Sequence, residues 1–235
     1  MKENQPTHTG FALPYQEFVF EQDLKPFETD LLRTAVLKLI DTKEGILYHN
    51  HKKDGFLYSY PLIQYKSIFG KAAIVYLGKA IGDIGNLFGN INQEVEVEGK
   101  KISFRIKKIY AQLYQLRVLD YYRNYNLIQW LPLQNENYTA YANIEGDKEK
   151  EDFLKKILTG NILSFAEGVG WSVRGEIRIE NFEIKDEKWT SFKGHKFLAF
   201  NINFDTNVFL PPHIGLGKGA AHNYGVVYPL KKTIV

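Results

Sequence analysis

Hydrophobic and polar positions change period early in the chain. Residues 15–22 (YQEFVFEQ) are rich in residues that favour strands, so a β-strand is predicted there. Apolar positions then recur at three- and four-residue spacing from Phe27 to Ile40, which predicts an amphipathic helix. Pro26 suits the first helical position, because the amide it lacks would have no helical partner there. The chain is therefore predicted to open with a strand and a helix.

The rest of the first half indicates two hairpins around a short helix. Residues 60–78 contain two β-rich runs divided at Gly70, and residues 72–77 are apolar on both faces, which predicts a central strand. Residues 80–91 predict a short helix weakened by glycine, and residues 94–106 predict a second hairpin. The order strand–helix–strand–strand–helix–strand is typical of the ferredoxin-like split βαβ unit.

The second half can be interpreted in the same order. A strand is predicted within residues 111–122, and a helix over residues 147–167. Residues 176–184 and 196–204 predict a long hairpin. The apolar alternation changes phase within the first of these strands, so a β-bulge is expected near residues 180–181. We predict an α+β fold of two tandem ferredoxin-like (RRM-like) domains.

Length and composition fit this architecture. The 235 residues, 44% of them hydrophobic, suffice for two small domains, which we place at residues 1–106 and 107–235. The absence of cysteine excludes disulfides, cysteine nucleophiles and thiolate metal sites. No signal-peptide core and no run of eighteen apolar residues is found, so we expect a soluble cytoplasmic protein without a membrane partner.

The distribution of charge is more informative than the net charge of +3. No acidic residue follows Asp205, and residues 101–123 combine lysines and arginines with several tyrosines. Such a combination suits RNA, because cations attract phosphates and aromatic rings stack on unpaired bases. A tyrosine-rich strand with a solvated, charged edge would have the same composition, so both interpretations stay open.

Residues 211–230 (PPHIGLGKGAAHNYGVVYPL) form the most glycine-rich stretch of the chain. A dinucleotide-binding loop would be followed by a helix and a crossover, for which too few residues remain. A mononucleotide-binding loop would place serine or threonine after Lys218, where Gly219 stands. The stretch is therefore either a backbone surface for phosphates of another kind or a turn-rich hairpin.

The stretch LYHNHKKDGFLYSY contains the other candidate chemistry. In an extended chain His49 and His51 project to one side, roughly 6–7 Å apart. The pair could hold a metal with further ligands, form structural hydrogen bonds, or act as acid and base near neutral pH. Nearby Lys43 and Lys52 can neutralise a phosphate and Tyr58 offers a hydroxyl donor, which favours the last interpretation.

Acid–base groups of this kind would be sufficient to cleave RNA. The 2′-hydroxyl of RNA is a built-in nucleophile, so a protein must only remove its proton, protonate the leaving 5′-oxygen and stabilise the charged phosphorane. Two histidines with a lysine and a tyrosine can supply all three services.

Together these features resemble the CRISPR-associated repeat-RNA endoribonucleases of the RAMP superfamily. The resemblance spans nearly the whole chain and is strongest in LYHNH, YPLIQYKSIFGKAAIVYLG and GLGKGAAHNYGVV. It implies cleavage of precursor CRISPR RNA within each repeat, without metal or cofactor, leaving a 2′,3′-cyclic phosphate and a 5′-hydroxyl. It also implies CRISPR repeat RNA as the partner. Subunits of a CRISPR effector complex and a second copy of the chain are further partners that the sequence leaves open.

The resemblance also assigns residues. The family's loop runs Gly-x-Gly, a spacer, then Gly-aromatic-Gly; Asn223 replaces one glycine, and asparagine tolerates positive φ. The implied catalytic residues are His49, His51, Tyr58 and Lys43. The implied RNA-binding residues are Gly215, Gly217, Lys218, Gly219, Gly225 and Lys52. Two alternatives remain: a protein that binds repeat RNA without cutting it, and a structural subunit of an effector complex.

Overall fold

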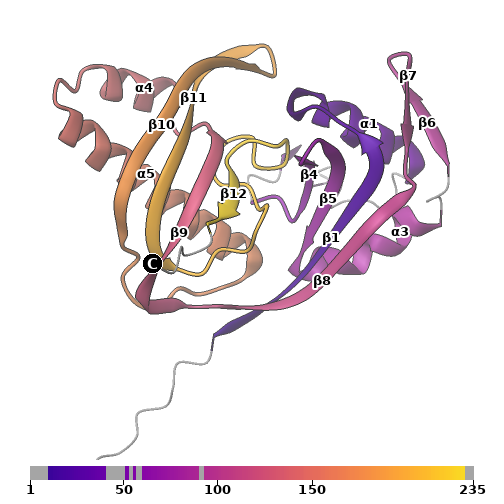
Figure 1. The fold of residues 1–235 in the computed structure, drawn as a ribbon, viewed down its shortest axis with the longest axis horizontal. Helices are drawn as coiled ribbons and strands as arrows, with labels where there is room; N and C mark the ends of the chain where they lie inside the picture. Colours follow the sequence, from indigo (N-terminus) through magenta and orange to yellow (C-terminus); the bar gives the residue numbers. More distant parts are fainter. Residues whose placement is uncertain (1–9, 41–50, 53–54, 57–59, 90–92, 231–235) are drawn as a thin grey trace, which may run out of the picture.

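The structure is a computed structural model that describes residues 10–40, 51–52, 55–56, 60–89 and 93–230. Two four-stranded antiparallel sheets lie side by side, with helices on their outer faces (Figure 1). Within these described ranges, none of the helices has both the length and the apolar composition needed to cross a bilayer. The predicted α+β class with two tandem ferredoxin-like domains is confirmed.

The first sheet has the strand order β4-β5-β1-β8, which is the ferredoxin order read from its second strand. The elements of this half are β1 (Phe11–Asp23), η1 (Pro26–Glu28), α1 (Thr29–Leu39), β2 (His51–Lys52), β3 (Gly55–Phe56), β4 (Ile63–Ile68), β5 (Lys71–Leu77), η2 (Gly78–Asp83), α3 (Ile84–Phe88), β6 (Glu94–Val97), β7 (Lys100–Ser103) and β8 (Ile106–Leu116).

The predicted hairpin at Gly70 and the central position of the strand after it are confirmed. Phe69 and Gly70 have φ values of 49° and 77°, which allow the tight two-residue turn between β4 and β5. Strand β5 lies between β4 and β1 and is buried almost throughout, as expected for a strand that is apolar on both faces.

The fourth strand of the first sheet differs from the prediction. The hairpin of residues 94–106 forms a separate two-stranded sheet, β6-β7, whereas β8 pairs with β1 and completes the first sheet. The sheets therefore divide at Arg117 rather than between residues 106 and 107. Strand β8 is exposed over most of its length, so its sequence carries little of the periodicity that would have assigned it.

The second sheet has the order β10-β11-β9-β12. Its elements are β9 (Val118–Trp130), α4 (Asn135–Ala142), α5 (Asp147–Val169), β10 (Ile179–Phe192), β11 (His195–Val208) and β12 (Val226–Pro229). The expected bulge is present, because the β10–β11 register shifts after Glu180 and Asn181 has φ 45°. Residues 209–225 contain no helix; this glycine-rich segment stands where the second helix of a ferredoxin-like unit would be.

Candidate functional site

The glycine-rich loop, residues 209–225, runs between the two sheets (Figure 1, the yellow segment beside β12). On one side Val227 N donates to Ile214 O at 2.9 Å, so the loop pairs with β12. On the other side Tyr65 N donates to Ala221 O at 2.8 Å, so the loop also pairs with β4. The loop therefore covers the inner edges of both sheets and joins the two domains.

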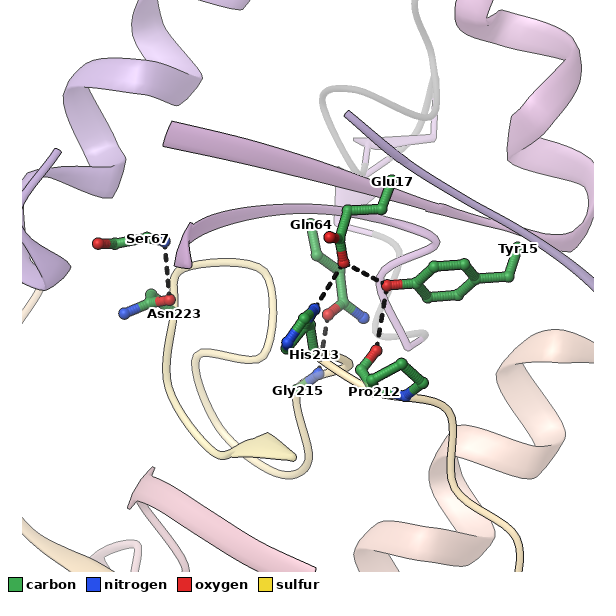
Figure 2. A network of polar contacts seen from close by, with 8 residues as sticks. All are labelled: Tyr15, Glu17, Gln64, Ser67, Pro212, His213, Gly215 and Asn223. Carbon is green, nitrogen blue, oxygen red and sulfur yellow. Dashed lines mark hydrogen bonds and ion pairs between the residues drawn. The ribbon is translucent and has the colours of Figure 1, made fainter. Parts of the chain in front are cut away.

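Buried polar side chains of the first domain bind the loop backbone. Gln64 Oε1 accepts from Gly215 N at 2.8 Å, and Tyr60 OH donates to Gly215 O at 2.8 Å (Figure 2 shows the contact of Gln64). Lys66 is fully buried, and its Nζ donates to Ala220 O at 2.6 Å. Burial lowers the pKa of the Lys66 ammonium to about 7, because a charge is costly away from water.

Asn223, which replaces a glycine of the family's loop, adopts φ 65°. The expectation that asparagine tolerates this backbone is confirmed. Its side chain adds a contact that glycine cannot make, because Asn223 Oδ1 accepts from Ser67 N at 3.0 Å (Figure 2). The substitution therefore retains the turn and ties it to β4.

Packing inside the protein explains several of the glycines. A Cβ on Gly215 would lie 2.6 Å from Ala220 O, and a Cβ on Gly225 would overlap Leu216 O. Gly225 also has φ 58°, and its N–H donates to Gln129 O at 3.0 Å. The amides of Gly215 and Gly225 are thus already bonded within the protein, so an RNA contact of these two through their N–H groups would require rearrangement.

Lys218 lies at the partly exposed turn of the loop, between Gly217 and Gly219. Its Nζ lies 4.8 Å from the centre of the Phe197 ring, a cation–π contact. The two side chains border a surface depression of about 580 Å³. Its lining residues are Gln134, Glu136, Asn137, His195, Lys196, Phe197 and Lys218. This arrangement places Lys196 and Lys218 at the depression beside the largely buried ring of Phe197. Contact of Lys218 with RNA stays a prediction.

A buried acid–base cluster between the domains was missed by the sequence analysis. Glu17, on β1, is 2% exposed; Tyr15 OH donates to its Oε2 at 2.6 Å, and His213 Nδ1 lies 2.6 Å from the same oxygen (Figure 2). Burial, and then the Glu17 carboxylate, raise the pKa of the Tyr15 hydroxyl. The only signal of this cluster in the sequence was a glutamate, Glu17, at an inward-facing strand position. Its histidine partner, His213, is 196 residues away along the chain.

A second contact of this kind ties the loop to the first helix. His222 Nδ1 lies 2.6 Å from Asp30 Oδ1, and Thr29 Oγ1 donates to His222 O at 3.2 Å. The neighbouring His222 side chain lowers the pKa of the Asp30 carboxyl. Both histidines of the loop, His213 and His222, are thus held by carboxylates of the first domain.

The predicted catalytic residues lie mostly outside the described residues. Lys43, His49 and Tyr58 belong to this group. His51 and Lys52 form β2, in which His51 pairs with Phe56 of β3. The backbone of His51 and Lys52 is therefore extended. The roles of these residues and the RNA contact of Lys52 stay predictions.

Comparison with known proteins covers almost the entire chain. The family model for the Cas6b N-terminal domain matches residues 12–115, and that for the Cas6b C-terminal domain matches residues 117–230. The chain is 29% identical over 147 residues to the uncharacterized protein MJ0978 of Methanocaldococcus jannaschii, which covers 61% of this chain and 97% of the relative.

Solved structures share the fold. A crystal structure of Cas6b superposes with a TM-score of 0.84 at 23% identity, covering 94% of this chain and all of the other. A second, of the CRISPR RNA processing endoribonuclease Cas6b, has a TM-score of 0.71 at 21% identity over the same shares. Because the two domain models match in order and together cover residues 12–115 and 117–230, the chain belongs to the Cas6b family.

Proposed function

We propose that this protein is an endoribonuclease that cleaves precursor CRISPR RNA within its repeats. The match of both halves to the Cas6b domain models carries the proposal. A solved neighbour with the same fold is named a CRISPR RNA processing endoribonuclease, which supports it. The histidine pair and its lysine and tyrosine neighbours supply chemistry suited to RNA, as the sequence indicates.

The proposed reaction needs no metal. One of His49 and His51 removes the proton of the 2′-hydroxyl, and the other protonates the leaving 5′-oxygen. Oxygen 2′ attacks the adjacent phosphorus, the bond from phosphorus to the 5′-oxygen breaks, and a 2′,3′-cyclic phosphate and a 5′-hydroxyl result. Lys43 and Tyr58 stabilise the charge of the phosphorane.

The glycine-rich loop contributes to RNA binding through its exposed turn. Lys218 attracts a phosphate. Because Gly217 and Gly219 on either side have no side chains, their backbone can approach that phosphate closely. Gly215 and Gly225 act through the shape of the loop, since their N–H groups already bond within the protein. Lys52 contacts the RNA next to the histidine pair.

Product analysis tests this function. The purified protein is incubated with repeat RNA in excess EDTA, and the new RNA ends are mapped. Cleavage at one position with a 2′,3′-cyclic phosphate and a 5′-hydroxyl is expected. Tight binding of the RNA without cleavage would assign the protein to the non-cleaving repeat binders, and neither binding nor cleavage would favour a structural subunit. A requirement for added Mg²⁺ would contradict the proposed mechanism.

A further inference from the structure

Each of the two sheets has one inner and one outer edge strand, and these four edge strands differ in how they are protected from pairing with another chain. The inner edges, β4 and β12, pair with the glycine-rich loop. The outer edge of the second sheet, β10, has two register shifts and carries charge along its length. Its charged residues are Glu180, Glu183, Lys185, Asp186, Glu187 and Lys188. Bulges and charges of this kind keep other chains from pairing with a sheet edge.

Strand β8, the outer edge of the first sheet, has less of this protection, because its one register shift and its two lysines all lie within the first three residues of the strand. In the described part of the chain it pairs with β1 alone, and its other edge lies along the outside of the molecule (Figure 1). Ile109 and Leu113, two residues on the same face, are 47% and 60% exposed. Residues 106–116 contain no acid, and their charges are confined to Lys107 and Lys108. A long, exposed and largely uncharged edge is a template for another strand.

We propose that β8 pairs antiparallel with β8 of a second copy of this chain, with the two-fold axis at Ala111. This interface goes beyond the proposed function and does not depend on it. The pairing would join the first sheets of the two copies into one continuous sheet. The interface is isologous: where one residue of the first copy faces another of the second, the reverse contact is made as well.

The side chains of β8 select this register. An axis at Ala111 places Ile109 opposite Leu113, so the exposed apolar side chains cover each other. It also places Lys108 opposite Tyr114, an aromatic partner like Tyr110, over which Lys108 Nζ already lies at 4.4 Å from the ring centre. No like charges face each other. An axis at Tyr110 would set Leu113 against Lys107, and an axis at Gln112 would set Ile109 against Gln115. In both registers an exposed apolar side chain faces a polar one.

The bulge in β8 is compatible with this pairing. The β1–β8 register shifts between Ile106 and Lys108, while residues 108–116 pair with β1 without interruption. The proposed contact uses residues 108–114, which lie within that regular segment. The β10 edge offers no segment that is equally regular and free of charge.

Engineered cysteines test the register, because the native chain has none. Facing Cα atoms across an antiparallel pair are about 4.5–5.5 Å apart, within reach of a disulfide. Ala111→Cys is therefore expected to form a disulfide-linked dimer under mild oxidation. Ile109→Cys and Leu113→Cys should each remain uncrosslinked alone but crosslink when mixed. Lys188→Cys on β10 is the matched control and should stay monomeric. Absence of the Ala111→Cys dimer, or equal crosslinking of Lys188→Cys, would overturn the proposal.

Sedimentation of the full chain without engineered cysteine tests the association itself. The wild-type protein is expected to sediment as a dimer of the 27.2 kDa chain at micromolar concentration. Ala111→Lys places two ammonium groups face to face at the axis and should raise the dimer dissociation constant at least tenfold. Circular dichroism of the variant should match the wild type, since the position is exposed. A monomeric wild type, or an Ala111→Lys variant that remains dimeric, would contradict the proposal.

Discussion

The glycine-rich loop and the histidine stretch are the two parts of the sequence that point to chemistry, but their positions in the fold differ. The loop is hydrogen-bonded to a sheet on each side, and buried side chains of the first domain form hydrogen bonds with its backbone. In the histidine stretch, the described part is the short β2–β3 pair. We therefore expect substitutions in the buried part of the loop to alter the stability of the protein, and substitutions of the histidines to alter the rate of cleavage.

The largest effect is expected from the histidine pair. His49→Ala and His51→Ala should each slow single-turnover cleavage by roughly 10²–10⁴-fold, the usual contribution of a positioned proton-transfer group. Tyr58→Phe and Lys43→Ala should cost less, since each supplies part of the charge stabilisation. The thermal midpoint and the RNA affinity of the histidine variants should remain near those of the wild type. A histidine variant that cleaves normally would end the proposed role of that residue.

The loop should respond in stability. Gly225→Ala forces a Cβ against Leu216 O at a backbone of φ 58°, so a loss of roughly 2–4 kcal/mol in the free energy of unfolding is expected. Gly160→Ala is the matched control, because Gly160 lies within helix α5 with open space around its Cα. The free energy of unfolding of the Gly160→Ala control should rise by about 0.5–1 kcal/mol, because alanine favours the helix over glycine. Urea unfolding measures both, and equal effects would break the comparison.

The buried Lys66 should make the loop contact depend on pH. Its folded pKa of about 7 lies below the ordinary value of 10.5, so between these pH values the unfolded chain binds more protons than the folded one. The stability of the wild type therefore rises with pH in this window, by up to about 1.4 kcal/mol per unit, relative to Lys66→Met. Urea unfolding of both proteins at pH 7, 8, 9 and 10 measures the difference. Parallel curves would show that Lys66 does not titrate there.

The smallest effect is expected at the exposed turn of the loop. Lys218→Glu should weaken repeat-RNA binding by about tenfold, because a phosphate contact is lost. The plot of log affinity against log salt should become shallower, with the magnitude of its slope smaller by about one or more. Lys188→Glu, on the outer edge strand β10, is the matched control and should leave both quantities unchanged. Filter binding at several salt concentrations measures them. Equal responses of the two variants would make the loop a purely structural element.

Local patterns in the sequence were sufficient where local contacts determine the structure. The turn at Phe69 and Gly70 and the bulge near Asn181 both follow from period-two alternation and its interruption. Strand β8 could not be assigned in this way, because an exposed edge strand lacks a buried face to mark its period. Its membership in the first sheet follows from pairing with β1, which the sequence does not display.

The candidate site divides along the same line. The histidine pair and the glycine-rich stretch are conspicuous in the sequence because their residues are neighbours along the chain. Glu17 and His213 come together only in the fold, as do Lys66 and Ala220. These long-range contacts show that the loop also docks on the first domain, which composition could not show.

Cleavage of a repeat RNA carrying a single 2′-deoxy nucleotide at the scissile position tests the central claim most directly. Removing that one oxygen eliminates the proposed nucleophile and leaves the phosphates that the protein binds. We expect cleavage to be abolished in EDTA and in Mg²⁺ alike, while the affinity for the RNA stays within a few-fold of that for the unmodified repeat. Cleavage of the deoxy-substituted RNA at the same position would contradict the account.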